Sequence, residues 1–142
     1  MTRSVPLVLL ILASAFLSTT CATKPMLPPP TGPCAHPGTP DPHAPLVCVH
    51  DGDLSHISAS PDPAHAYKGA TIQFFTDSGS GTLAIASSTL PVDSITCIPG
   101  QGHCTAKVRD DAGAANHKYY AIVTQGSRVG VSPDPTIIID TD

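Results

Sequence analysis

The sequence contains no glutamate and no tryptophan, and only 4% of its residues are aromatic. All 11 acidic residues are aspartates. Glutamate favours helix, whereas aspartate, glycine, proline, serine and threonine favour turns and extended chain, so the composition predicts strands and turns. With so few aromatic residues, the core has to be built from valine, isoleucine, leucine and alanine. A small domain with such a core is expected to need additional covalent links.

Basic residues are also scarce. The chain has seven lysines and arginines, a formal net charge of -4 and no basic cluster, which argues against nucleic acid as a partner. It has no Cys-x-x-Cys motif and no phosphate-binding loop, and the Gly-Ser-Gly at residues 79–81 lacks the outer glycines of a nucleophile elbow. The sequence therefore predicts no catalytic site, no enzyme and no cofactor.

Residues 1–22 have the features of an export signal. Their apolar run, residues 5–17, is too short to span a bilayer and has the length of a signal-peptide core. The Leu-Ser-Thr-Thr-Cys that ends at Cys21 resembles a bacterial lipobox, which would attach a lipid to Cys21, although Thr20 departs from the usual small residue. Cleavage after Ala22 is the alternative. We therefore expect an exported protein, held at the outer membrane or in the periplasm as a lipoprotein, or secreted.

The rest of the chain divides into two regions. Residues 23–45 contain nine of the 16 prolines and are predicted to form an extended, semi-rigid tether. Residues 46–142 consist of short alternating apolar runs broken by turn residues, which is typical of an all-β sandwich. Strands are predicted at residues 46–50, 54–59, 65–67, 70–75, 82–87, 94–98, 104–109, 118–124, 127–131 and 135–140. No amphipathic helix is predicted.

Several of these stretches resemble small exported bacterial cupredoxin-like β-sandwich proteins. The resemblance rests on Ile-Ser-Ala-Ser-Pro-Asp-Pro (57–63), Tyr-Lys-Gly-Ala-Thr-Ile-Gln-Phe (67–74), Tyr-Tyr-Ala-Ile-Val (119–123) and Asp-Pro-Thr-Ile-Ile-Ile-Asp (134–140). It implies a Greek-key sandwich, cupredoxin-like or immunoglobulin-like, of about seven strands, with the last strands pairing near the first. A blue-copper site needs two histidines, a cysteine and usually a methionine. After the last cysteine, Cys104, only His117 and no methionine follows, so the resemblance carries no copper site and no activity.

Four cysteines follow the leader: Cys34, Cys48, Cys97 and Cys104. An even number of cysteines in an exported chain indicates two disulfides, and four cysteines allow three connectivities. Sequential pairing is favoured, because Cys97 and Cys104 flank a plausible turn and point inward on their strands. Cys34 would then join Cys48 and fasten the end of the tether to the first strand. The sequence also allows the other two connectivities.

The same region suggests a competing function. Cys34 and Cys48 each precede a histidine by two residues, and His36, His43 and His50 could ligate zinc or copper in an exported metal-binding module. The spacing matches no strong zinc motif. The favoured hypothesis is therefore an exported interaction or structural module, whose partner is an unknown protein of the cell envelope.

Overall fold

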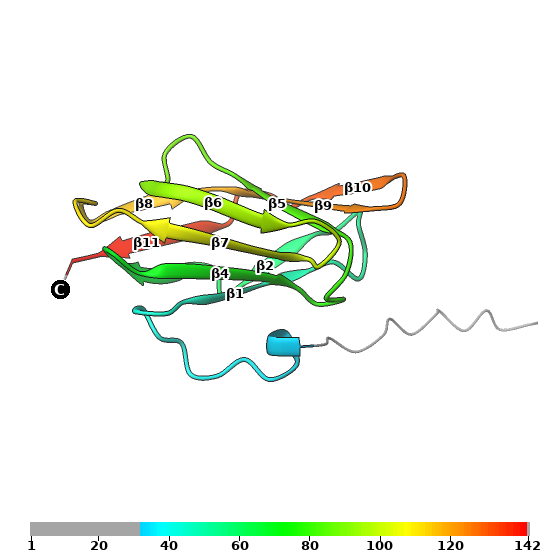
Figure 1. The fold of residues 1–142 in the computed structure, drawn as a ribbon, viewed down its shortest axis with the longest axis horizontal. Helices are drawn as coiled ribbons and strands as arrows, with labels where there is room; N and C mark the ends of the chain where they lie inside the picture. Colours follow the sequence, from blue (N-terminus) through cyan, green and yellow to red (C-terminus); the bar gives the residue numbers. More distant parts are fainter. Residues whose placement is uncertain (1–31, 142) are drawn as a thin grey trace, which may run out of the picture.

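The computed structural model describes residues 32–141. These residues form a single 3-10 turn, η1 (Gly32–Ala35), and eleven strands in three sheets (Figure 1). Within this part of the chain, no helix is long and apolar enough to span a membrane. The strands are β1 (Leu46–His50), β2 (Ser58–Ser60), β3 (Ala64–Tyr67), β4 (Thr71–Thr76), β5 (Thr82–Ala86), β6 (Val92–Ile98), β7 (His103–Val108), β8 (Ala115–Lys118), β9 (Tyr120–Gln125), β10 (Arg128–Val131) and β11 (Thr136–Asp140).

The predicted all-β sandwich is confirmed, whereas the expected count of about seven strands is wrong. The large sheet has the order β2-β1-β4-β7-β6, and the two smaller sheets have the orders β10-β9-β5 and β3-β11-β8. In Figure 1, β8 and β11 lie behind the large sheet. Two parallel pairs, β1 with β4 and β3 with β11, join segments that are far apart in the sequence. The count rises to eleven because the chain repeatedly leaves one sheet for another after short strands.

One aliphatic core joins the three sheets. The alternation predicted for β7 is confirmed, since Cys104, Ala106 and Val108 are buried while the residues between them are more exposed. Phe74 of the large sheet packs edge-on against Tyr119, with 5.5 Å between ring centroids. These two rings are the largest side chains that are fully buried, so they connect the two layers at the centre of the molecule.

Two predicted strands differ from the structure. Of the second predicted strand, residues 54–59, only residues 58 and 59 are extended, as the start of β2. Asp53 accepts hydrogen bonds from the backbone N–H and the hydroxyl of Ser55, which folds the residues before them into turns. The strand predicted at residues 118–124 is split at Tyr119, whose backbone N–H donates to the carbonyl of Pro135. At this residue the chain passes from the β3-β11-β8 sheet to the β10-β9-β5 sheet.

The N-terminal strap, residues 32–45, contacts both β3 of the β3-β11-β8 sheet and β4 of the large sheet. Its Pro42 carbonyl accepts a hydrogen bond from the N–H of Tyr67, and its Pro45 carbonyl accepts one from Gln73. The predicted tether covers residues 23–45, so its second part contacts the sandwich along the strap. The predicted signal peptide, the lipidation site Cys21 and residues 23–31 lie outside the described residues.

Candidate functional site

Both disulfides of the sequential pairing are present. Cys97 and Cys104 are directly opposite each other on β6 and β7, with their Cα atoms 4.0 Å apart. Cys34 and Cys48 have Cα atoms 5.6 Å apart, and their bond fastens η1 to the outer face of β1. The first disulfide therefore fixes the register of a hairpin, and the second attaches the N-terminal strap to the large sheet.

The histidines considered as metal ligands do not form a cluster. Among the described residues, no group of three or more histidine, cysteine or acidic side chains could hold a metal ion. His36 is exposed, and the ring of His43 lies against Tyr67 with 4.6 Å between centroids. His50 is engaged by other partners. The structure therefore separates the three candidate ligands.

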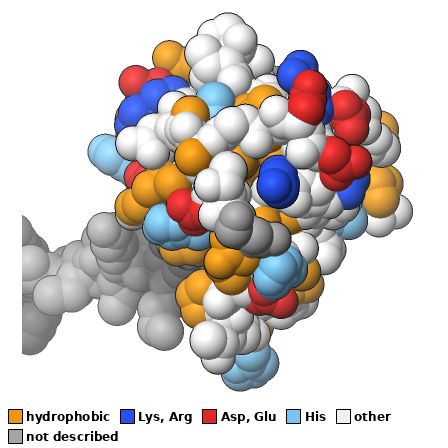
Figure 2. All heavy atoms as spheres, turned by 90° about the vertical axis from the view of Figure 1, so that its left-hand side faces the viewer, with side chains coloured by type: hydrophobic (Ala, Val, Ile, Leu, Met, Phe, Trp, Pro, Cys, Tyr) orange, Lys and Arg blue, Asp and Glu red, His pale blue; other side chains and the backbone are white. Residues whose placement is uncertain are grey.

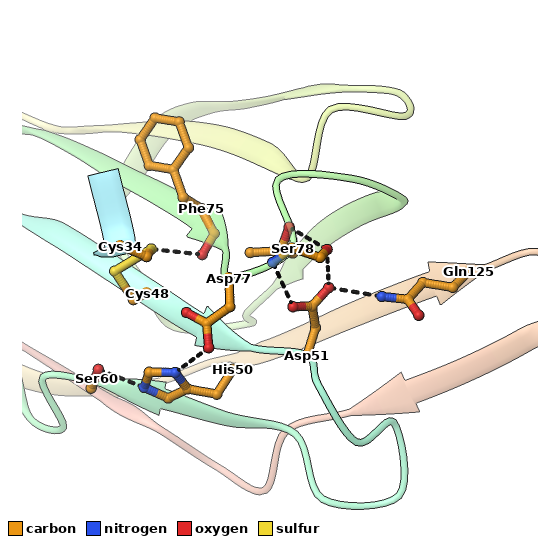
Figure 3. A network of polar contacts seen from close by, with 10 residues as sticks. Cys34, Cys48, His50, Asp51, Ser60, Phe75, Asp77, Ser78 and Gln125 are labelled. Atoms are coloured by element: carbon orange, nitrogen blue, oxygen red, sulfur yellow. Dashed lines mark hydrogen bonds and ion pairs between the residues drawn. A yellow bond between two sulfur atoms is a disulfide. The ribbon is translucent and has the colours of Figure 1, made fainter. Parts of the chain in front are cut away.

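His50 is the centre of a relay of three side chains on the outer face of the large sheet (Figure 3). It ends β1, and its strand pairs with β2, which carries Ser60, and with β4, which Asp77 follows. The N–H of Asp77 donates to the carbonyl of Val49, which continues the β1–β4 pairing beyond the strand end. Three neighbouring strands thus bring Ser60, His50 and Asp77 together.

The geometry of the relay defines the role of each atom. His50 Nδ1 lies 2.7 Å from Asp77 Oδ2, and His50 Nε2 lies 2.7 Å from Ser60 Oγ. An ionised carboxylate can only accept hydrogen bonds, so in the neutral ring Nδ1 carries the proton and Nε2 accepts from the hydroxyl of Ser60. The His50 side chain is 42% exposed and that of Asp77 is 20% exposed. The relay is therefore open to solvent at Ser60 and partly shielded at the carboxylate.

A second, buried network supports the first. Asp51 follows His50, is only 2% exposed, and accepts hydrogen bonds from the backbone N–H of Ser78 (3.0 Å), the hydroxyl of Ser78 (2.5 Å) and the side-chain amide of Gln125 (2.8 Å). Ser78 is the neighbour of Asp77, and Gln125 ends β9. This network fixes the loop that presents Asp77 and ties the large sheet to the opposite layer (Figure 3).

Beside Ser60 the strap and the β2–β3 corner enclose a hollow of about 290 Å³. Its walls include Pro37, Pro40, Leu46 and Pro61, and Ser60 also lines it. An adjoining hollow continues along the same prolines to His65. We call these two hollows the proline groove. It is mainly apolar, and it exists because the strap folds back onto the sheet.

The outer face of the β10-β9-β5 sheet has a different character. Tyr120, Val129 and Val131 are 46%, 59% and 51% exposed, and Val131 is paired with the half-buried Ile122. β10 is an edge strand whose inner side packs closely, since a Cβ atom on Gly130 would approach the carbonyl oxygen of Leu54. We call the outer side, with these four apolar side chains, the bare face.

Charged groups are dispersed elsewhere. On the end of the sandwich shown in Figure 2, basic and acidic side chains lie next to one another, interspersed with histidines. Arg109 Nε lies 2.8 Å from Asp111 Oδ1, and this exposed pair raises the pKa of the arginine and lowers that of the aspartate. Such exposed pairs contribute little to stability.

From the sequence, His50 is predicted only as a candidate metal ligand, and Ser60 and Asp77 are not predicted as functional residues. The outward position of each follows from strand alternation, but their meeting depends on the strand order, for which the sequence carries no local signal. Neither a protein-family model nor a curated protein sequence matches this chain.

Proposed function

We propose that this protein is an exported interaction module of the cell envelope, which binds an extended segment of a protein partner at the bare face. The observation that carries this proposal is the exposure of Tyr120, Val129 and Val131 side by side on one sheet. Exposed apolar clusters of this kind are typical of interaction sites in folded proteins.

The edge position of β10 supports an extended partner. Within the described residues β10 pairs only with β9, so its other edge presents backbone donors and acceptors that an added strand can use. Alternate side chains of that strand would point to the same side as Val129 and Val131. The partner segment is therefore expected to have apolar residues at every second position.

The compartment is part of the same proposal. Residues 1–22 serve as the export signal, and the chain is either lipidated on Cys21 or released after Ala22. Two disulfides in a chain of this size support an oxidising compartment. The fold would belong with the small cupredoxin-like sandwiches that lack copper, used here as a binding scaffold.

Site-specific photo-crosslinking in the exported full chain tests the proposal. A benzophenone side chain replaces Val131 on β10 or, as the control, Thr96, which is exposed on β6, an edge strand of the large sheet. We expect a discrete adduct at position 131 only, and an adduct peptide with alternating apolar residues. The synthetic peptide should bind the purified protein, and Val131→Lys should weaken this binding by at least about tenfold. Equal adducts at both positions, or a peptide that binds V131K as well as the original protein, would overturn the proposal.

A further inference from the structure

We propose that Ser60 is a nucleophile that accepts the acyl group of a small, uncharged aliphatic ester, with His50 as its general base. Asp77 is the positioning residue that orients His50. This activity goes beyond the proposed binding function and uses the opposite side of the sandwich. It also departs from the sequence-based expectation that the chain has no catalytic site.

The distances within the relay support the role of Ser60 as a nucleophile. An activated serine requires a base within hydrogen-bond reach and a third group that orients the base. The contacts of 2.7 Å on both sides of the His50 ring meet this requirement. Since Nδ1–H is directed to the carboxylate, Nε2 has its lone pair toward Ser60 Oγ. The relay therefore holds the tautomer that can remove the serine proton.

The relay rests on rigid elements. His50 and Ser60 lie on paired strands, and Cys48, two residues before His50, is fixed by the disulfide to Cys34. Asp77 is held by its N–H bond to β1, and its neighbour Ser78 is bound by the buried Asp51. Catalytic groups that already have their reactive positions before the substrate binds add little entropic cost to the reaction.

The proline groove supplies a place for the acyl chain. Ser60 lines the hollow of about 290 Å³, whose walls include Pro37, Pro40, Leu46 and Pro61. Its apolar walls suit a short aliphatic chain. Asp41 also lines the groove and is exposed, so a negatively charged acyl group is disfavoured. The substrate class that follows is an ester of a short, uncharged carboxylic acid.

The reaction balances with water as the only co-reactant. Ser60 Oγ attacks the ester carbonyl carbon while its proton passes to His50 Nε2. The bond between the carbonyl carbon and the alcohol oxygen breaks, and the alcohol leaves with that proton. Water then attacks the acyl-Ser60 ester and gives a proton to Nε2, which returns it to Ser60 as the carboxylic acid is released. The Asp77 carboxylate stabilises the imidazolium ring in both steps.

Covalent labelling of the oxidised, exported chain with a fluorophosphonate tests the nucleophile. We expect a phosphonyl group on Ser60, located by peptide mass spectrometry. Ser60→Ala should remove it, and His50→Gln should slow labelling on the order of 10²-fold. Ser58→Ala is the matched control, because Ser58 is exposed on the same strand directly opposite His50, and this variant should be labelled like the original protein. Failure of the unsubstituted chain to react under conditions that label an authentic serine esterase would overturn the inference, as would unchanged labelling of S60A.

Two further measurements test the positioning role of Asp77 and the placement of the acyl chain in the proline groove. Asp77→Asn should remove the far-downfield proton resonance of His50 Nδ1–H and slow labelling, and loss of the resonance at an unchanged labelling rate would refute the positioning role. A nitrophenyl ester of butyrate should acylate Ser60 at least about tenfold faster than the corresponding monoester of succinate, because Asp41 repels the added carboxylate. Equal rates would overturn the assignment of the acyl chain to the proline groove.

Discussion

The two outer faces of this sandwich are built from the same kind of alternating strand, yet one is partly covered and the other is bare. On the large sheet, the N-terminal strap covers the outward side around Cys48, which is only 4% exposed although it points away from the core, whereas the outward Thr71 and Gln73 of β4 stay exposed. On the β10-β9-β5 sheet nothing among the described residues covers Val129 and Val131, which are more than half exposed.

The difference shows that alternation decides which way a side chain points, while burial depends on what is stacked above it. A disulfide and backbone hydrogen bonds hold the strap in place, so this side of the sandwich can carry the proline groove and the relay of Ser60, His50 and Asp77. The bare face keeps apolar groups available for another molecule. The following changes test this contrast, beginning with the one of largest expected effect.

Removing the disulfide that holds the strap should leave the outer side of the large sheet as uncovered as that of the β10-β9-β5 sheet. We expect Cys34→Ala with Cys48→Ala to lower the free energy of unfolding by about 3 kcal/mol in urea denaturation, since the bond closes a 14-residue separation. The strap should then be cut rapidly in limited proteolysis. Cys97→Ala with Cys104→Ala is the control, which should also lower stability but leave the strap protected. A strap that resists proteolysis without Cys34 and Cys48 would show that its other contacts suffice.

Removing the Asp51 carboxylate should loosen the joint between the two layers. Asp51→Ala leaves the partly buried N–H of Ser78 and the amide of Gln125 without their acceptor, so the free energy of unfolding should fall by about 2 kcal/mol in urea denaturation. Amide exchange at Ser78 should accelerate. Asp53→Ala is the control: it removes an exposed carboxylate whose low pKa comes mainly from the hydroxyl and N–H of Ser55, and a smaller fall is expected. Equal falls would contradict a special role for the buried network.

The adjacent residues Tyr119 and Tyr120 allow a buried tyrosine to be compared with an exposed one. Burial raises the pKa of Tyr119, and the nearby Asp62 adds to this, whereas the exposed Tyr120 has its pKa raised by a hydrogen bond to Asp134. Above about pH 10 an unfolded tyrosine loses its proton. The folded Tyr119 keeps it, so the unfolded state binds fewer protons and the free energy of unfolding falls as the pH rises.

Tyr119→Phe should therefore weaken the alkaline loss of stability, measured as unfolding midpoints at neutral and alkaline pH. At neutral pH it should cost less than about 1 kcal/mol, because the Tyr119 hydroxyl is buried and accepts or donates no hydrogen bond among the described residues. Tyr120→Phe is the comparison and should weaken the alkaline loss less, because Tyr120 is exposed and solvent screens its interaction with Asp134. An alkaline loss that persists fully in Y119F would assign it to other groups.

The smallest effect on stability is expected at the bare face. Val131→Lys should change the free energy of unfolding by less than about 0.5 kcal/mol in a thermal or urea melt, because Val131 is already 51% exposed and a lysine can extend its charged end into solvent. Val123→Lys, on the neighbouring strand but fully buried, should prevent folding. A large loss of stability in V131K would mean that the face is covered in the native protein.

Much of the fold could be predicted because it depends on neighbours in the chain. The alternation at residues 104–108 and the strand at residues 46–50 agree with β7 and β1, and the four cysteines pair as the favoured connectivity has it. The split at Tyr119 could not be predicted, because the change of sheet depends on a hydrogen bond to the distant Pro135. The turn that shortens β2 is local, since Asp53 accepts hydrogen bonds from Ser55, but the strand pattern of residues 54–59 outweighed this signal in the prediction.

By itself, then, the sequence determined the all-β class, the outward or inward direction of most strand residues and the presence of two disulfides, because composition, period and the even number of cysteines set these locally. Only the tertiary structure decided that β1 lies between β2 and β4, which brings Ser60 and Asp77 to His50 across separations of 10 and 27 residues. It also decided which face is covered. Both outcomes follow from the pairing of distant segments, and the strand pattern of each segment is compatible with several such pairings.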